Sequence, residues 1–225
     1  MTNIYIPPSV STDNLTLKGN GTPNNPLSVV YPDLLVNSNM TIDIALNLNK
    51  IYFTGAYTLT VNNNVNVAII DGDTSGTITV NAGFTLTVYS AINNSITLNG
   101  SGTLNIPSLT LINSNVTFSI PTISGNGTFS IASGYTLTVN GNISMTISNI
   151  TGNGTLSVAS GYTLTINNNL SVSIPNISGA GTLSVASGYT LTIGSNTTFS
   201  IATVSGAGTL SVASGYTLTI GSNAT

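Results

Sequence analysis

The sequence has very few side chains that titrate near neutral pH, and this shortage restricts the functions it can have more than any other feature. It contains no cysteine and no histidine, and its seven charged residues, two cationic and five acidic, all precede residue 74. General acid–base catalysis, thiol chemistry and transition-metal ligation need such groups. We therefore expect no enzymatic activity and no cofactor, and we expect residues 74–225 to provide a shape and a surface.

Other absences exclude further classes of protein. No run of about 18 apolar residues occurs, so the sequence predicts no membrane-spanning helix. Two cationic side chains are too few to neutralise many phosphates, which argues against nucleic acid as a partner. The first residues show neither the basic nor the apolar segment of a signal peptide. Leu, Ile and Val recur at regular intervals, which argues against disorder.

A 27-residue repeat dominates the second half of the chain. The segment ISGAGTLSVASGYTLTI begins at Ile177, and close copies begin at Ile123, Ile150 and Val204. Earlier copies are eroded but recognisable, as in Phe84-Thr-Leu-Thr, which lies 27 residues after Tyr57-Thr-Leu-Thr. Counted at this spacing, the repeats predict about seven units, starting near residue 40.

Within a unit, apolar and polar residues alternate, as strands with one buried face require. Ser, Gly and Asn clusters separate the alternating runs and indicate turns. We therefore expect three short strands and three corners in each 27-residue coil. The sequence predicts an all-β fold, a triangular parallel β-solenoid with a right-handed course, in which Leu137, Leu164, Leu191 and Leu218 form one inward column.

The N-terminal segment differs from the repeats and divides the chain into residues 1–39 and 40–225. Residues 11–30 contain two short apolar runs around a Gly/Pro/Asn turn, which predicts a hairpin. We expect residues 1–39 to cap the solenoid or to attach it to another structure. The sequence ends within a repeat, and we expect the last coil to be covered by more chain or by another subunit.

Aromatic residues recur at one position of the repeat. The first explanation is a corner stack that packs against the core, and the second is an exposed sugar-binding strip. The residues are Tyr57, Phe84, Tyr135, Tyr162, Tyr189 and Tyr216.

Asp71 and Asp73 are the only candidate metal ligands. The segment from Asp71 to Gly76 resembles the opening of a calcium-binding loop. The full loop requires a Glu six residues after that Gly, where this chain has Ala82. The alternative is a polar corner between coils, and we predict no metal site.

Asn-x-Ser/Thr sequons are frequent, and each marks a possible N-glycosylation site on a surface loop. The composition, rich in Asn, Ser and Thr, makes many of them expected by chance. The candidates include Asn14, Asn39, Asn115, Asn142 and Asn196.

Thr-x-Thr pairs also recur with the repeat, and we expect them to form two outward columns on one face. Such arrays resemble the ice-binding face of insect-type antifreeze proteins. The alternative is that Thr is simply a good residue for exposed strands. The array comprises Thr136, Thr138, Thr163, Thr165, Thr190, Thr192, Thr217 and Thr219.

The segment from Leu15 to Val29 contains a GNGT…NPLSV element that resembles one in tail-fibre and appendage proteins of phages. The repeats resemble the β-helical shafts of viral fibres and spikes. This resemblance implies a virion appendage on the particle surface, adhesive or structural, with other virion subunits and a host glycan or protein as partners, and a homotrimer by analogy. Alternatives are a cell-surface adhesin or filament subunit and, third, an ice-binding protein.

Overall fold

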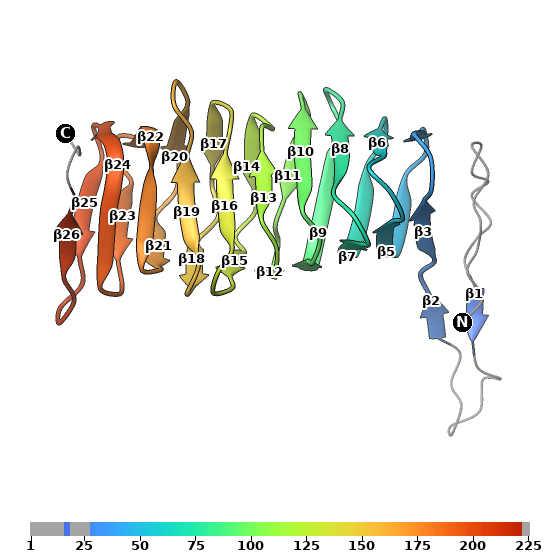
Figure 1. Ribbon diagram of the computed structural model, residues 1–225, viewed down its shortest axis with the longest axis horizontal. Coiled ribbons are helices and arrows are strands. Elements are labelled where there is room, and N and C mark those ends of the chain that lie inside the picture. Colours follow the sequence, from blue (N-terminus) through green and yellow to red (C-terminus); the bar gives the residue numbers. More distant parts are fainter. Residues whose placement is uncertain (1–15, 19–27, 222–225) are drawn as a thin grey trace.

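The protein is a straight rod of stacked β-strands (Figure 1). The computed structural model describes residues 16–18 and 28–221, which contain no helix. The strands wind through about nine turns, so the predicted parallel β-solenoid is confirmed with more turns than the expected seven. At about 4.8 Å per turn, nine turns give a rod of about 43 Å.

The rod has three faces, which we number in chain order. Face 1 contains β3 (Asp33–Val36), β12 (Leu109–Ile112), β15 (Thr128–Ile131), β18 (Asn149–Gly152), β21 (Leu170–Ser173), β23 (Thr190–Ile193) and β25 (Thr209–Val212). Face 2 contains β4 (Met40–Ile42), β6 (Thr58–Val61), β8 (Gly76–Val80), β10 (Ile96–Gly100), β13 (Val116–Phe118), β16 (Thr136–Val139), β19 (Thr155–Val158) and β26 (Leu218–Ile220). Face 3 contains β11 (Thr103–Asn105), β14 (Thr122–Ser124), β17 (Ile143–Met145) and β20 (Thr163–Ile166).

Five longer strands bend around a corner and contribute to two faces each. They are β5 (Leu46–Phe53), β7 (Val65–Gly72), β9 (Thr85–Ile92), β22 (Asn176–Val185) and β24 (Thr197–Gly206). The first three run from face 3 to face 1, and the last two run from face 2 to face 3.

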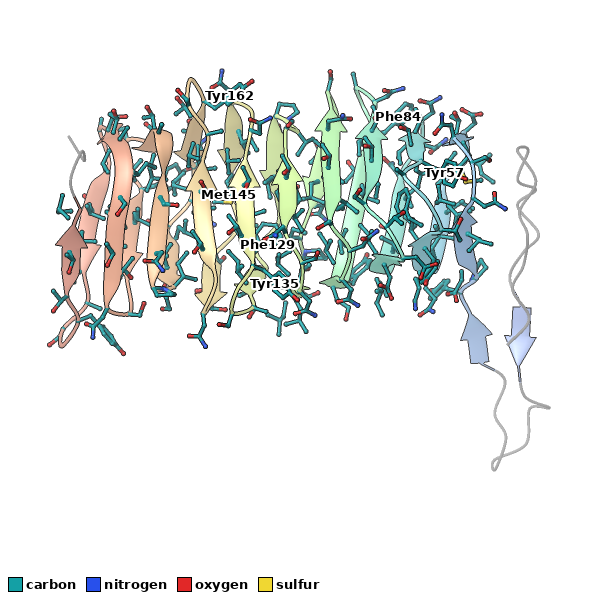
Figure 2. The ribbon with its side chains drawn as sticks, in the orientation of Figure 1. Tyr57, Phe84, Phe129, Tyr135, Met145 and Tyr162 are labelled. Atoms are coloured by element: carbon teal, nitrogen blue, oxygen red, sulfur yellow. The ribbon has the colours of Figure 1, made fainter. Side chains whose placement is uncertain are left out.

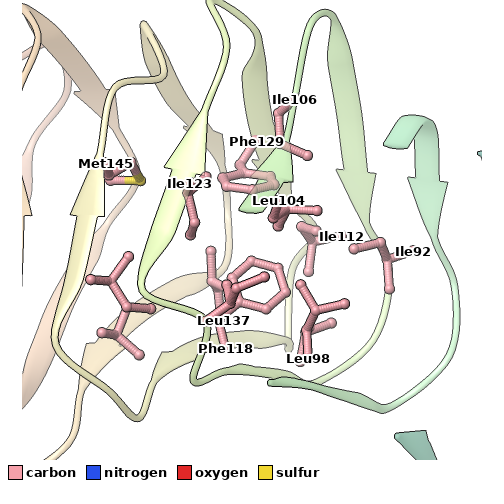
Figure 3. Packing of buried hydrophobic residues seen from close by; sticks show 14 of the residues in the cluster. Ile92, Leu98, Leu104, Ile106, Ile112, Phe118, Ile123, Phe129, Leu137 and Met145 are labelled. Carbon is pink, nitrogen blue, oxygen red and sulfur yellow. The ribbon is translucent and has the colours of Figure 1, made fainter. Parts of the chain in front are cut away.

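Strict alternation explains the core. In β16, Leu137 and Val139 are each 2% exposed, while Thr136 and Thr138 face outward. The same alternation in stacked strands fills the interior with aliphatic side chains and a few aromatic rings (Figure 3). The rings of Phe118 and Phe129 lie 5.8 Å apart between centroids. Burial of this continuous core supplies the main driving force for folding.

The length of a turn differs from the length of the sequence repeat. On face 2, Thr136 pairs with Thr155, Thr155 with Asn176, and Asn176 with Thr198, all in parallel register. These steps are 19, 21 and 22 residues, not 27. The predicted 27-residue coil is therefore wrong.

The repeat contains four strands, whereas a turn contains three. From β14, the first repeat comprises β14, β15, β16 and β17, and each strand pairs with the strand three places later. Each repeat consequently begins one face further around the rod, and three repeats occupy four turns. The predicted leucine column is also wrong: Leu164 points inward but stacks between Ile143 and Leu183.

One recurring type of corner is an Ala-Ser-Gly-Tyr turn. At one such corner, the Tyr135 N–H donates to the Ala132 carbonyl at 3.2 Å, and Gly134 has a φ of 83°. This left-handed conformation suits glycine, which has no Cβ.

The N-terminal hairpin predicted for residues 11–30 is present in the described part of that segment. β1 (Thr16–Lys18) pairs antiparallel with β2 (Ser28–Val30) in a two-stranded sheet separate from the 24-stranded solenoid sheet. The solenoid sheet already includes β3, so its first strand precedes residue 40.

Candidate functional site

The predicted Thr array does not lie on one face. The Thr-x-Thr strands β16, β20, β23 and β26 lie on faces 2, 3, 1 and 2, because each repeat advances by one face. Thr136 and Thr138 therefore point in a different direction from Thr163 and Thr165. The expectation of two columns on one face is wrong for this set.

A different column of threonines does run along face 2, and we did not predict it. Its members are register partners in five consecutive turns and are followed by three serines. They are Thr58, Thr77, Thr97, Thr117 and Thr138, then Ser157, Ser178 and Ser200. The threonine spacing of 19 to 21 residues is visible in the sequence, but the stronger 27-residue repeat obscures it.

The aromatic residues of the repeat do not form a stack either. Tyr135 immediately precedes β16 on face 2 and Tyr162 immediately precedes β20 on face 3, so they occupy different corners of the rod (Figure 2). Tyr135, Tyr162 and Tyr189 are 37–38% exposed, whereas Tyr57 and Phe84 are partly buried against the core. Both the continuous core stack and the continuous strip are thus excluded by the register.

Five sequon asparagines have a structural role at the corners: Asn39, Asn115, Asn142, Asn169 and Asn196. Each accepts, through Oδ1, the backbone N–H of a threonine in the next turn at 2.8–3.0 Å. The next residue points inward and the one after it outward, so a corner Asn followed by a strand produces Asn-x-Ser/Thr. Four of these, Asn39, Asn115, Asn142 and Asn196, are among the predicted glycosylation candidates, and the fifth candidate, Asn14, lies outside the described residues. These hydrogen bonds use Oδ1, whereas a glycan would attach to Nδ2. The corner role therefore does not test glycosylation, which stays a prediction.

Replacing Asn142 with alanine is expected to destabilise the protein by about 1 kcal/mol, because the Thr163 N–H loses its 3.0 Å acceptor. The nearby exposed Asn140 is the matched control, since its own backbone N–H bonds to the Phe118 carbonyl. Asn140→Ala should change the free energy of unfolding by less than about 0.5 kcal/mol. Urea denaturation compares the two, and equal losses would contradict the corner role.

Asp71 and Asp73 are engaged by side chains of β5. Lys50 Nζ lies 3.4 Å from Asp71 Oδ2, and Tyr52 Oη donates to Asp73 Oδ1 at 2.6 Å. The ammonium of Lys50 also lies 5.7 Å from the centre of the Tyr52 ring. Among the described residues, no three acidic side chains gather in a way that could hold a metal ion. The arrangement is that of a polar corner joined across two turns.

The hydrogen bond to Asp73 raises the pKa of Tyr52, with smaller contributions from burial and from the charges of Asp73 and Asp71. The raised value means that neutral Tyr52 stabilises the fold. This stabilisation is complete below the unfolded pKa of about 10 and is lost as the pH rises through the folded pKa.

We therefore expect an alkaline absorbance titration to show one tyrosine that ionises late. Tyr52→Phe should remove that late step, because it removes the ionising hydroxyl. Asp73→Asn should move the step to lower pH, because it removes the acceptor's charge. A titration that is the same in both variants and in the parent would refute the assignment.

Comparisons with protein families, with curated proteins and with solved structures found no match. The described residues form no helix that is long and apolar enough to cross a lipid bilayer.

Proposed function

We propose that this chain is a non-enzymatic structural and adhesive shaft of an extracellular appendage. The supporting observation is that charged side chains are confined to one end of the rod. The described charged side chains, Asp33, Asp43, Lys50, Asp71 and Asp73, lie in the first turns, whereas residues 74–221 form an uncharged rod. Its outward residues from β13 onward on face 2 are Thr, Ser and Asn.

The uniform part is suited to a spacer. Every face carries the same strands in rotation, so no single side of residues 122–206 is chemically distinct. A repeat of this kind can change length by whole units without creating new surface chemistry. The N-terminal turns, by contrast, carry carboxylates, a lysine and aromatic rings, and aromatic residues are enriched at interaction surfaces.

We assign the appendage to a virion surface, on the resemblance of residues 15–29 to phage appendage proteins. The alternative is a cell-surface adhesin or filament. Immuno-electron microscopy with an antibody raised against the repeats distinguishes them. Label on purified particles supports the virion, label on uninfected cells supports the alternative, and label confined to the cell interior would overturn both.

A second candidate, ice binding, is favoured by one observation. The five threonines from Thr58 to Thr138 form an outward column with one residue per turn. The test is thermal hysteresis of the protein with and without Thr77→Lys and Thr97→Lys. No hysteresis in the parent protein would eliminate ice binding.

A further inference from the structure

An exposed apolar strip lies on face 1 and belongs neither to the repeat nor to the last turn. Its most exposed members are Tyr89, Leu109 and Leu111, which are 46%, 53% and 38% exposed. Leu111 pairs with Ala91, and Ala91 pairs with Ile69 in the turn before. We define the face-1 strip as the exposed Tyr89, Leu109 and Leu111 together with the half-buried Ile69; Ala91, which lies between Leu111 and Ile69 in the column, is only 6% exposed.

Strand β12 creates the strip by reversing the usual alternation. Leu109 and Leu111 pair with Thr128 and Ser130, outward residues of the next turn, while Thr110 is fully buried. The Thr110 hydroxyl donates to the Val88 carbonyl at 3.2 Å. A one-residue slip would bury both leucines. The fold instead leaves them exposed, as surfaces that bind a partner do.

The charges beside the strip are mainly negative. Asp33 and Lys50 precede Ile69 in the same outward column, and Asp71 and Asp73 lie at its edge. Three carboxylates therefore face one ammonium, which already pairs with Asp71 at 3.4 Å. A complementary occupant combines apolar residues with a free cation.

The β1–β2 hairpin of this chain has that composition. Its strands read TLK and SVV, and Lys18 is the only cation of the sequence besides Lys50. An isolated two-stranded hairpin is at best marginally stable in water, so it needs a surface to pack against. Figure 1 shows β1 and β2 beyond β3, outside the stack of solenoid turns.

We propose that the face-1 strip of one molecule binds the β1–β2 hairpin of a second copy, with Lys18 close to the carboxylates at the edge of the strip. The contact joins the end of one rod to the side of another. It goes beyond the proposed function and does not depend on whether the appendage is viral.

Because the chain has no cysteine, single cysteines report this contact directly. One protein carries Thr16→Cys or Leu17→Cys in turn, so that both sides of the hairpin are sampled. The other carries Ser90→Cys, an exposed position next to Tyr89 of the strip. After mixing under oxidising conditions, we expect a disulfide-linked heterodimer.

Variants of the Ser90→Cys protein test the surface. Leu109→Thr with Leu111→Ser copies the outward residues of β15 and should abolish the heterodimer. Thr151→Ser, on β18 of the same face, should leave the yield unchanged. Circular dichroism confirms that each variant is folded. Lys18→Asp should lower the yield about two- to fivefold, and Asp73→Lys in the partner should restore it.

Three results would overturn the proposal. They are the absence of a heterodimer with either hairpin cysteine, a heterodimer that persists after the double leucine substitution, and a disulfide that forms within one molecule carrying both cysteines. The last result would show that the hairpin folds back onto its own strip.

Discussion

Replacing Gly152 with alanine should destabilise the rod by roughly 3–5 kcal/mol, a loss far above that of an ordinary surface substitution. Gly152 has a φ of 107°, and a Cβ built there would lie 2.2 Å from the Ile131 carbonyl oxygen. That oxygen belongs to the backbone of the preceding turn, so it cannot move aside without separating two turns. The substitution therefore adds steric overlap to backbone strain.

Gly161 is the matched control for Gly152. It lies in the same repeat and has a φ of 80°, but a Cβ there would meet nothing within 4 Å. Gly161→Ala should cost only the left-handed strain, about 1–2 kcal/mol. Calorimetric melting temperatures compare the two variants, and a similar loss for both would show that close stacking of the turns is not what makes Gly152 necessary.

Replacing Leu164 with aspartate should destabilise the protein by about 5 kcal/mol or more at neutral pH, because the carboxylate would be buried without a partner. Leu164 is 0% exposed and stacks between Ile143 and Leu183. Burial raises the pKa of a carboxyl above its unfolded value of about 3.9. The destabilisation should therefore be smallest in acid and grow as the pH rises from the unfolded to the folded pKa.

The control is Leu164→Asn, because asparagine is similar to aspartate in size and polarity but does not titrate. Its melting temperature should be low at every pH from acid to neutral. The parent's solenoid beyond residue 74 should also melt at a nearly constant temperature over that range, because it has no Asp, Glu, His, Lys or Arg side chain. A Leu164→Asp protein whose stability did not improve in acid would argue that the position is not buried.

The strands and their inward residues could be predicted from the sequence, because alternation depends on local pattern alone. The length of a turn could not be predicted, because one of the four strands of the repeat has almost no alternating pattern of apolar and polar residues. The segment around Ile177 has only that one inward residue before Gly179 and Gly181, so it reads as a turn. In the structure Ile177 pairs with Leu156 and completes a fourth strand. This strand shifts every repeat by one face.

The corner asparagines and the exposed leucines of β12 could not be predicted either, because both depend on which residues are neighbours in adjacent turns. The corner role of the sequon asparagines depends on which turn lies next, which the 27-residue spacing misassigned. The orientation of β12 was also not determined by sequence. In Leu109-Thr-Leu-Ile112, either the two leucines or Thr110 and Ile112 can face the core. The buried Ile112 and the hydrogen bond of Thr110 to Val88 fix the orientation that exposes the leucines.

Disulfide formation between paired cysteines tests most directly the claim that three repeats occupy four turns. Thr165 and Ser184 are register partners on face 3, whereas Thr165 and Thr192 occupy the same position of successive repeats on different faces. Partners in neighbouring turns lie about 4.8 Å apart, within the Cα separation of about 4.4–6.8 Å that a disulfide spans. The account predicts an intramolecular disulfide in Thr165→Cys/Ser184→Cys and none in Thr165→Cys/Thr192→Cys. The opposite result would show that the 27-residue repeat is itself one turn.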